Sequence, residues 1–150
     1  MTPDSLFSLA GLTAMAGWLL LIFAPRRFPR LNALPVLVIP FGLSLIYAVL
    51  VLIHFSGNGG GYDSLQSVRL LLASDWALLA GWVHYLAFDL MVGAAMAVRM
   101  DRAGIGRLVQ GAILPLVFLF GPLGLVVVVM TEIALRPLHL SRKGRAHVHA

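Results

Sequence analysis

The stretch WALLAGWVHYLAFDLMVGAAMAV, residues Trp76–Val98, decides the fold of this chain. It is almost entirely apolar, and at about 1.5 Å of rise per residue it is long enough to cross the ~30 Å hydrocarbon layer of a bilayer. An acid, Asp89, and a histidine, His84, lie near its middle. A carboxylate at that depth costs roughly 2.5–3.5 kcal/mol on insertion scales. The stretch therefore predicts a transmembrane helix in which other interactions offset the cost of burying the polar side chains.

The composition of the whole chain also indicates an integral membrane protein. Of the 150 residues, 60% are hydrophobic and 11% are charged, whereas soluble domains have about 45–50% apolar and about 25% charged residues. The net charge of +5 does not indicate a nucleic-acid partner, because the basic residues lie at the ends of apolar segments, where they face lipid headgroups. The chain has no cysteine, which excludes thiolate chemistry, and the sequence predicts no cofactor and no metal site.

The apolar segments predict an all-α fold, an integral membrane bundle of four transmembrane helices. We expect one domain over residues 1–135 and a polar, basic tail over 136–150. Residues 64–74 have apolar side chains on one face, which predicts a short interfacial helix between the second and third spans. Such a helix is also placed to cover a site that opens on that side. The expected spans are residues 5–24, 31–55, 76–98 and 108–135.

The basic residues of the loops bear on the orientation in the membrane. Four spans put both termini on one side, and the loops after the first and third spans carry six basic residues against five on the opposite side. The arginines directly after the first span favour termini outside the cell. The chain opens at its first span, without a serine- and arginine-rich transit segment, so we expect a bacterial inner-membrane protein. The oligomeric state is not predicted.

The third span predicts a polar site near the middle of the membrane. Tyr85 and Gly93 lie four residues before and after Asp89, and Trp82 lies seven before it, so all four share one face of the helix. His84 lies about 140° around the helix from Asp89. The alternative for Asp89 is an interhelical hydrogen bond that fixes packing. For His84, Trp82, Tyr85 and Gly93 the alternative is packing against a neighbouring helix or lipid.

The fourth predicted span adds a break to this site. Gly121 and Pro122 lie at its midpoint, where proline removes a backbone donor and frees a carbonyl one turn earlier. We expect this carbonyl to meet the polar side chains of the third span at the same depth.

Two runs of residues resemble a known family. They are LAGWVHYLAFDLMVG, Leu79–Gly93, and FGPLGL, Phe120–Leu125. Together with the order of the spans, they resemble the neoxanthin-synthase-like, or abscisic-acid-deficient-4-like, membrane proteins of plastids and their bacterial relatives. In plants that family is associated with the isomerisation of violaxanthin to neoxanthin, in which an epoxide opens while a proton leaves carbon.

The resemblance implies an isomerase that acts on a carotenoid or another apolar isoprenoid without a redox cofactor. In that reading Asp89 is the acid, His84 is the base and Tyr85 orients the ring, because the reaction needs both a proton donor and a proton acceptor. Substrate would contact Trp82, Gly93, Gly121 and Pro122. The alternative is a non-enzymatic assembly or partner subunit of a pigment or respiratory complex in the membrane, which predicts a dry, well-packed bundle. A small transporter is a third alternative, which the lack of an internal repeat argues against.

Overall fold

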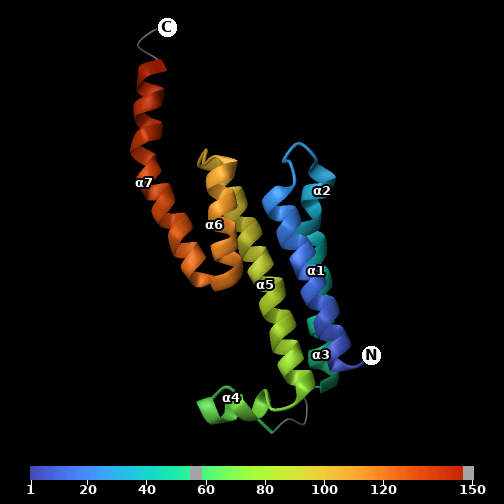
Figure 1. The fold of residues 1–150 in the computed structure, drawn as a ribbon. Helices are drawn as coiled ribbons and strands as arrows, with labels where there is room; N and C mark the ends of the chain where they lie inside the picture. Colours follow the sequence, from blue (N-terminus) through green and yellow to red (C-terminus); the bar gives the residue numbers. More distant parts are fainter. Residues whose placement is uncertain (55–58, 147–150) are drawn as a thin grey trace. The chain divides into compact units, whose positions relative to one another are not determined.

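The computed structural model describes residues 1–54 and 59–146, and side chains as far as Leu135 outside that gap. Every described element is a helix, which confirms the all-α class. The chain forms two units with their own internal packing, Met1–Ala94 and Ala95–Ala150 (Figure 1).

The first unit begins with α1 (Pro3–Phe23). The hydroxyl of Thr2 accepts a hydrogen bond from the backbone N–H of Ser5 at 3.3 Å, and Pro3 occupies the first helical position, where a missing N–H costs nothing. The helix ends just before Pro25, which cannot continue the hydrogen-bond ladder.

The second span is one helical run with a wide turn inside it. It consists of α2 (Pro29–Ala33), the π-helix η1 (Leu34–Val38) and α3 (Ile39–His54). The π-helical turn comes directly before Pro40, whose ring and missing N–H disturb the regular ladder in the preceding turn.

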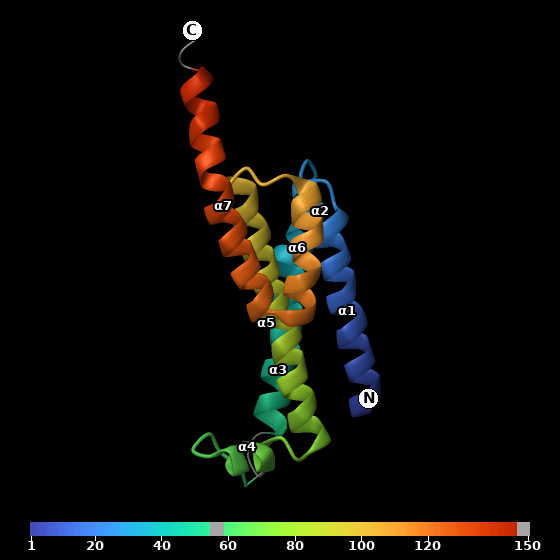
Figure 2. The same cartoon turned by 60° about the vertical axis from the view of Figure 1, so that its left-hand side comes forward.

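A short helix lies across the end of the first unit. The helix predicted over residues 64–74 forms as α4 (Leu65–Leu71), and Ser64 caps it by accepting a hydrogen bond from the N–H of Ser67 at 3.1 Å. After a short turn, α5 (Asp75–Arg102) begins. Both views show α4 beside the ends of α3 and α5 and across their direction (Figure 2).

Small residues let the helices of the first unit approach closely. A Cβ added at Gly17 would meet the side chains of Leu90 and Ile39, and one added at Gly93 would overlap the ring of Trp18. The buried core contains small and branched apolar residues from α1, α3 and α5: Ala10, Ala14, Leu43, Leu50, Leu79, Ala80, Val83, Leu86 and Ala87.

The second unit differs from the predicted fourth span, which was expected to cross the membrane with a break at Gly121 and Pro122. Residues 108–135 do not form one helix but lie in α6 (Arg107–Phe120) and α7 (Pro122–Ala146), which pack side by side as a hairpin (Figure 2). Gly121 has φ 36°, a conformation that residues with a Cβ avoid, and Pro122 has no N–H to continue α6. The break predicted at Gly121 is therefore a reversal of the chain between two helices.

The count of four spans is accordingly not confirmed. Among the described residues, three helical runs are long and apolar enough to cross a membrane: Pro3–Phe23, Pro29–His54 and Asp75–Arg102. Helix α7 continues to Ala146, so the segment predicted as a polar tail is helical that far, and its last four residues lie outside the described part.

A buried glutamine holds the turn between α5 and α6. Gln110 donates from Nε2 to Oδ1 of Asp101 at 2.7 Å and to the carbonyl of Ile105 at 2.8 Å. Its Oε1 accepts a hydrogen bond from Nη1 of Arg107 at 3.0 Å. The amide is almost fully buried, so these bonds satisfy a group that would otherwise destabilise the unit.

Candidate functional site: an apolar cavity at one end of the first unit

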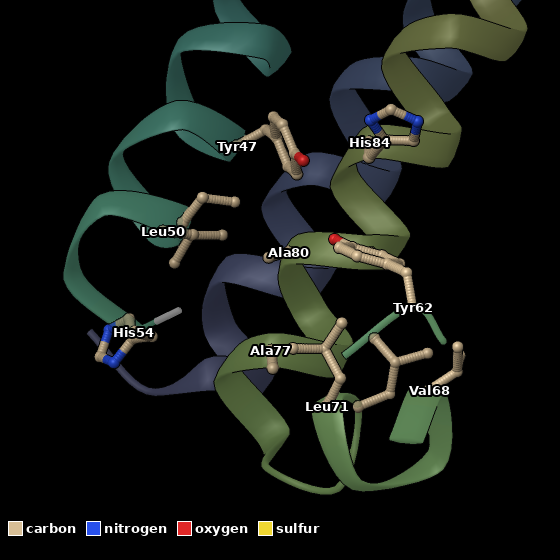
Figure 3. A pocket seen from close by; sticks show the side chains of 12 residues that line it. Tyr47, Leu50, His54, Tyr62, Val68, Leu71, Ala77, Ala80 and His84 are labelled. Atoms are coloured by element: carbon tan, nitrogen blue, oxygen red, sulfur yellow. The ribbon is translucent and has the colours of Figure 1, made fainter. Parts of the chain in front are cut away.

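A cavity of about 370 Å³ lies between α3, α4 and α5. Its volume falls within the ~300–1,000 Å³ typical of small-molecule pockets. Its lining is also typical of such pockets, because it is mostly apolar with a few polar groups. Its walls are formed by Tyr47, Leu50, Val51, His54, Tyr62, Val68, Leu71, Leu72, Ala77, Ala80, Gly81 and His84 (Figure 3).

Two helices build the long walls with the same spacing. On α3, Tyr47 and His54 lie seven residues apart, and on α5, Ala77 and His84 lie seven residues apart. Seven residues are close to two helical turns, so each pair lies on one face of its helix. Between Ala77 and His84, the α5 residues that line the cavity are the small residues Ala80 and Gly81. A Cβ added at Gly81 would meet one atom of Leu72 at 3.6 Å. The cavity exists because this part of α5 has almost no side chains to fill it.

The third wall comes from α4 and the loop before it. The N–H of Gly61 donates to the carbonyl of Ser67 at 3.2 Å, and a Cβ at Gly60 would overlap the backbone of Ser67 and Leu71. The glycines therefore let the loop lie directly on α4, which brings Tyr62 to the cavity opposite α3 (Figure 3). The prediction that the amphipathic helix could cover a site agrees with this wall.

Aromatic and imidazole rings line two levels of the cavity. Toward the middle of α5, the ring of His84 lies 5.0 Å from that of Tyr47 and 4.6 Å from that of Phe88, centroid to centroid. Toward the end of the helices, His54 stacks on Trp76 at 4.6 Å with the rings 3° from parallel. The cavity thus offers two imidazoles within an apolar surface.

The cavity is open and not enclosed. Tyr62 is 77% exposed, and His84 is also exposed. The cavity is therefore accessible from outside the unit.

The structure brings only one of the predicted catalytic residues to this cavity. His84 lines it, whereas Asp89 and Tyr85 do not. Asp89 is 8% exposed, and among the described residues no hydrogen bond or ion pair reaches its carboxylate. Tyr85 lies one turn before Asp89 and packs at 5.4 Å against Trp82, whose ring stacks on Phe7 of α1 at 5.6 Å.

The predicted substrate-binding residues lie elsewhere in the fold. Trp82 belongs to the aromatic group just described, and Gly93 lies against the buried ring of Trp18. Gly121 and Pro122 form the turn of the α6–α7 hairpin in the second unit. Their roles in binding stay predictions.

Three cavity residues were missed as site residues from the sequence. Tyr47 and His54 have the same spacing as the α5 wall, and Tyr62 follows the glycines that precede the amphipathic helix. These two signals, a repeated seven-residue spacing and a glycine loop before a short helix, were the available indications. Among the residues the structure describes, no group of three His, Asp or Glu side chains is arranged to hold a metal ion.

The helices and the cavity define a class of protein: an all-helical integral membrane protein with an open apolar cavity that contains histidine and tyrosine. The chain belongs to the ABA DEFICIENT 4-like family, whose model matches residues 5–127. This match confirms the resemblance drawn from the two sequence runs. No curated protein and no solved structure is significantly similar to the chain.

Proposed function

We propose that this protein is a membrane isomerase that acts on the end group of a carotenoid or a related isoprenoid. The observation that supports the proposal is the open apolar cavity with His84 and Tyr47 side by side in its wall. A dry packed bundle, which the subunit alternative predicts, would have no such space.

The volume favours an end group over a whole polyene. About 370 Å³ lies near the lower limit of ordinary ligand pockets, so a ring enters while the extended chain remains in the surrounding hydrocarbon. The apolar walls of α3, α4 and α5 would bind the ring carbons. Tyr62 and His54, nearer the ends of the helices, would bind a ring oxygen by hydrogen bonding.

The isomerisation needs one proton acceptor and one proton donor at the same ring. In the proposed step, His84 takes a proton from carbon, the C–H electrons form a new double bond, and the epoxide C–O bond breaks. Tyr47 gives its hydroxyl proton to the epoxide oxygen. The imidazolium of His84 then returns a proton to the Tyr47 phenolate, so the protein regains its starting state and no electron is gained or lost.

This assignment moves the proton donor from Asp89, the acid expected from the sequence, to Tyr47. Asp89 does not line the cavity. Its position on the other side of α5 suits a role in the packing of α5 against a neighbouring helix. Both candidates are testable by single substitutions.

The test is turnover of a carotenoid epoxide by the purified full chain in mild detergent, followed by chromatography of the extract. We expect Tyr47→Phe and His84→Phe each to lose about a hundredfold or more in rate, the usual contribution of a positioned acid or base. Ser44→Ala is the matched control: it removes a hydroxyl from the same helix as Tyr47, one that is bonded to the carbonyl of Pro40.

Each outcome separates the candidates. Loss in Asp89→Asn together with full activity in Tyr47→Phe would return the acid role to Asp89. Full activity in both His84→Phe and Tyr47→Phe would refute the catalytic role of the cavity. Co-purification of the chain with other subunits, with no epoxide converted and no isoprenoid in the organic extract, would favour the assembly-subunit alternative.

A further inference from the structure

A second cavity, lined with charged residues, lies in the second unit. It has a volume of about 460 Å³ and lies at the C-terminal end of α5, where α7 passes. The lining residues are Ala95, Met96, Arg99, Arg102, Ala103 and Glu132. Four of these six residues come from one face of α5, with spacings of three and four, and Ala103 follows directly after the end of that helix.

Two guanidinium groups give this cavity a positive charge. Nε of Arg99 donates to Oε2 of Glu132 at 2.6 Å, with the arginine side chain 46% exposed and the glutamate 16% exposed. This bond uses one of the five N–H donors of Arg99. Arg102 is exposed and forms no hydrogen bond or ion pair with any residue of the described part. Two arginines and one glutamate leave a formal charge of +1.

The level of the cavity along α5 indicates its ligand. Arg99 is the first charged residue after the apolar stretch that ends at Val98, so it lies where hydrocarbon meets headgroups. Ala95 and Met96 line the hydrocarbon side of the cavity, and the arginines line the other side. Guanidinium groups bind phosphate oxygens through paired, charge-assisted hydrogen bonds, and basic pockets at the ends of transmembrane helices suit anionic lipid headgroups.

We propose that this cavity binds a phosphate group, carried by an anionic phospholipid headgroup or by a soluble phosphate compound. The proposal concerns the second unit alone and does not depend on the reaction proposed for the first cavity.

The experiment uses the full chain in nanodiscs made of phosphatidylcholine with a minor fraction of phosphatidylglycerol, and counts the lipids retained by native mass spectrometry. Arg102→Gln is the primary variant, because Arg99→Gln also removes the ion pair with Glu132. Arg69→Gln is the matched control, since it removes one exposed positive charge from α4, outside the cavity. A parallel titration in detergent adds inorganic phosphate.

We expect the wild type and Arg69→Gln to retain phosphatidylglycerol in preference to phosphatidylcholine. Arg102→Gln should bind it about fivefold more weakly, the usual effect of one basic residue at a charged membrane surface. Retention that inorganic phosphate does not displace identifies the lipid as the source of the phosphate, and displacement identifies a soluble compound. Equal retention of both lipids by the wild type together with no binding of inorganic phosphate, unchanged binding in Arg102→Gln, or an equal loss in Arg69→Gln would each overturn the proposal.

Discussion

The contact between Gly93 and Trp18 leads to a prediction about how tightly α1 and α5 are packed. In Gly93→Ala, the new Cβ would lie 2.8 Å from Cζ3 and 3.0 Å from Cζ2 of Trp18, and closer still to Cη2. The Trp18 side chain is 1% exposed, so its ring has no free space into which it can move. The substitution therefore forces the two helices apart or the ring out of its rotamer.

The size of the effect can be isolated with a second glycine on the same helix. Replacing glycine by alanine within a helix stabilises by about 0.8–1.0 kcal/mol through backbone entropy alone. At Gly81 this gain meets no clash, because the added Cβ would lie 3.6 Å from the side chain of Leu72, an ordinary contact distance. At Gly93 the same gain is opposed by overpacking of about 1–3 kcal/mol. The propensity gain cancels in the comparison, so Gly93→Ala should be less stable than Gly81→Ala by about 1–3 kcal/mol.

The assay is thermal unfolding of both variants in the same detergent, followed by the loss of helical circular dichroism. At roughly 2–4 °C per kcal/mol for a chain of this length, the midpoints should differ by about 2–12 °C. Trp18→Phe combined with Gly93→Ala should recover part of the difference, because the smaller ring makes room for the methyl group. A Gly93→Ala variant as stable as Gly81→Ala would refute the argument that this contact limits the helix separation.

Three further substitutions test other features of the fold. Gly81→Leu should fill the cavity and reduce isoprenoid retention at least tenfold in the organic extract, while the unfolding midpoint stays within a few degrees; full retention would contradict the assigned binding site. Gln110→Leu should lower the free energy of unfolding by about 1–3 kcal/mol, because it removes the buried hydrogen bonds from Gln110 to Asp101 and to the carbonyl of Ile105. Gly121→Ala should cost about 1–2 kcal/mol, because an alanine is strained at φ 36°; equal stability would mean that the turn does not need this conformation.

The sequence predicted the helical class and the first three spans because hydropathy and length determine whether a segment can cross a membrane. It located the break at Gly121 but not its consequence. An apolar run of this length is compatible with one kinked helix or with two helices that fold back on each other. The choice depends on the sign of one φ angle, and hydropathy contains no information on that angle.

The site was predicted in part for a related reason. His84 and Asp89 were both identified, but the angle of about 140° between them already meant that one cavity on the helix surface would not include both. Which side of α5 faces a cavity depends on the rotation of α3 and α4 around it, and a single sequence does not determine that rotation. Tyr47 and His54 acquire their significance only once α3 lies opposite the small residues of α5.

The α6–α7 hairpin predicts an odd number of membrane crossings instead of four, because a hairpin returns the chain to the side from which it came. The ion pair between Glu132 and Arg99 places the late part of α7 at the end of α5, so the residues after it emerge on the side where α5 ends. If the three candidate spans before that point all cross the membrane, ten of the eleven basic residues lie on that one side, and Arg69 is the exception. Four spans divide the basic residues almost equally between the two sides, whereas three spans and a hairpin divide them unequally. Under the positive-inside rule this unequal division predicts a cytoplasmic C-terminus and an N-terminus on the opposite side. Reporter fusions at the two ends should therefore read opposite compartments, and two ends on the same side would require an even number of crossings.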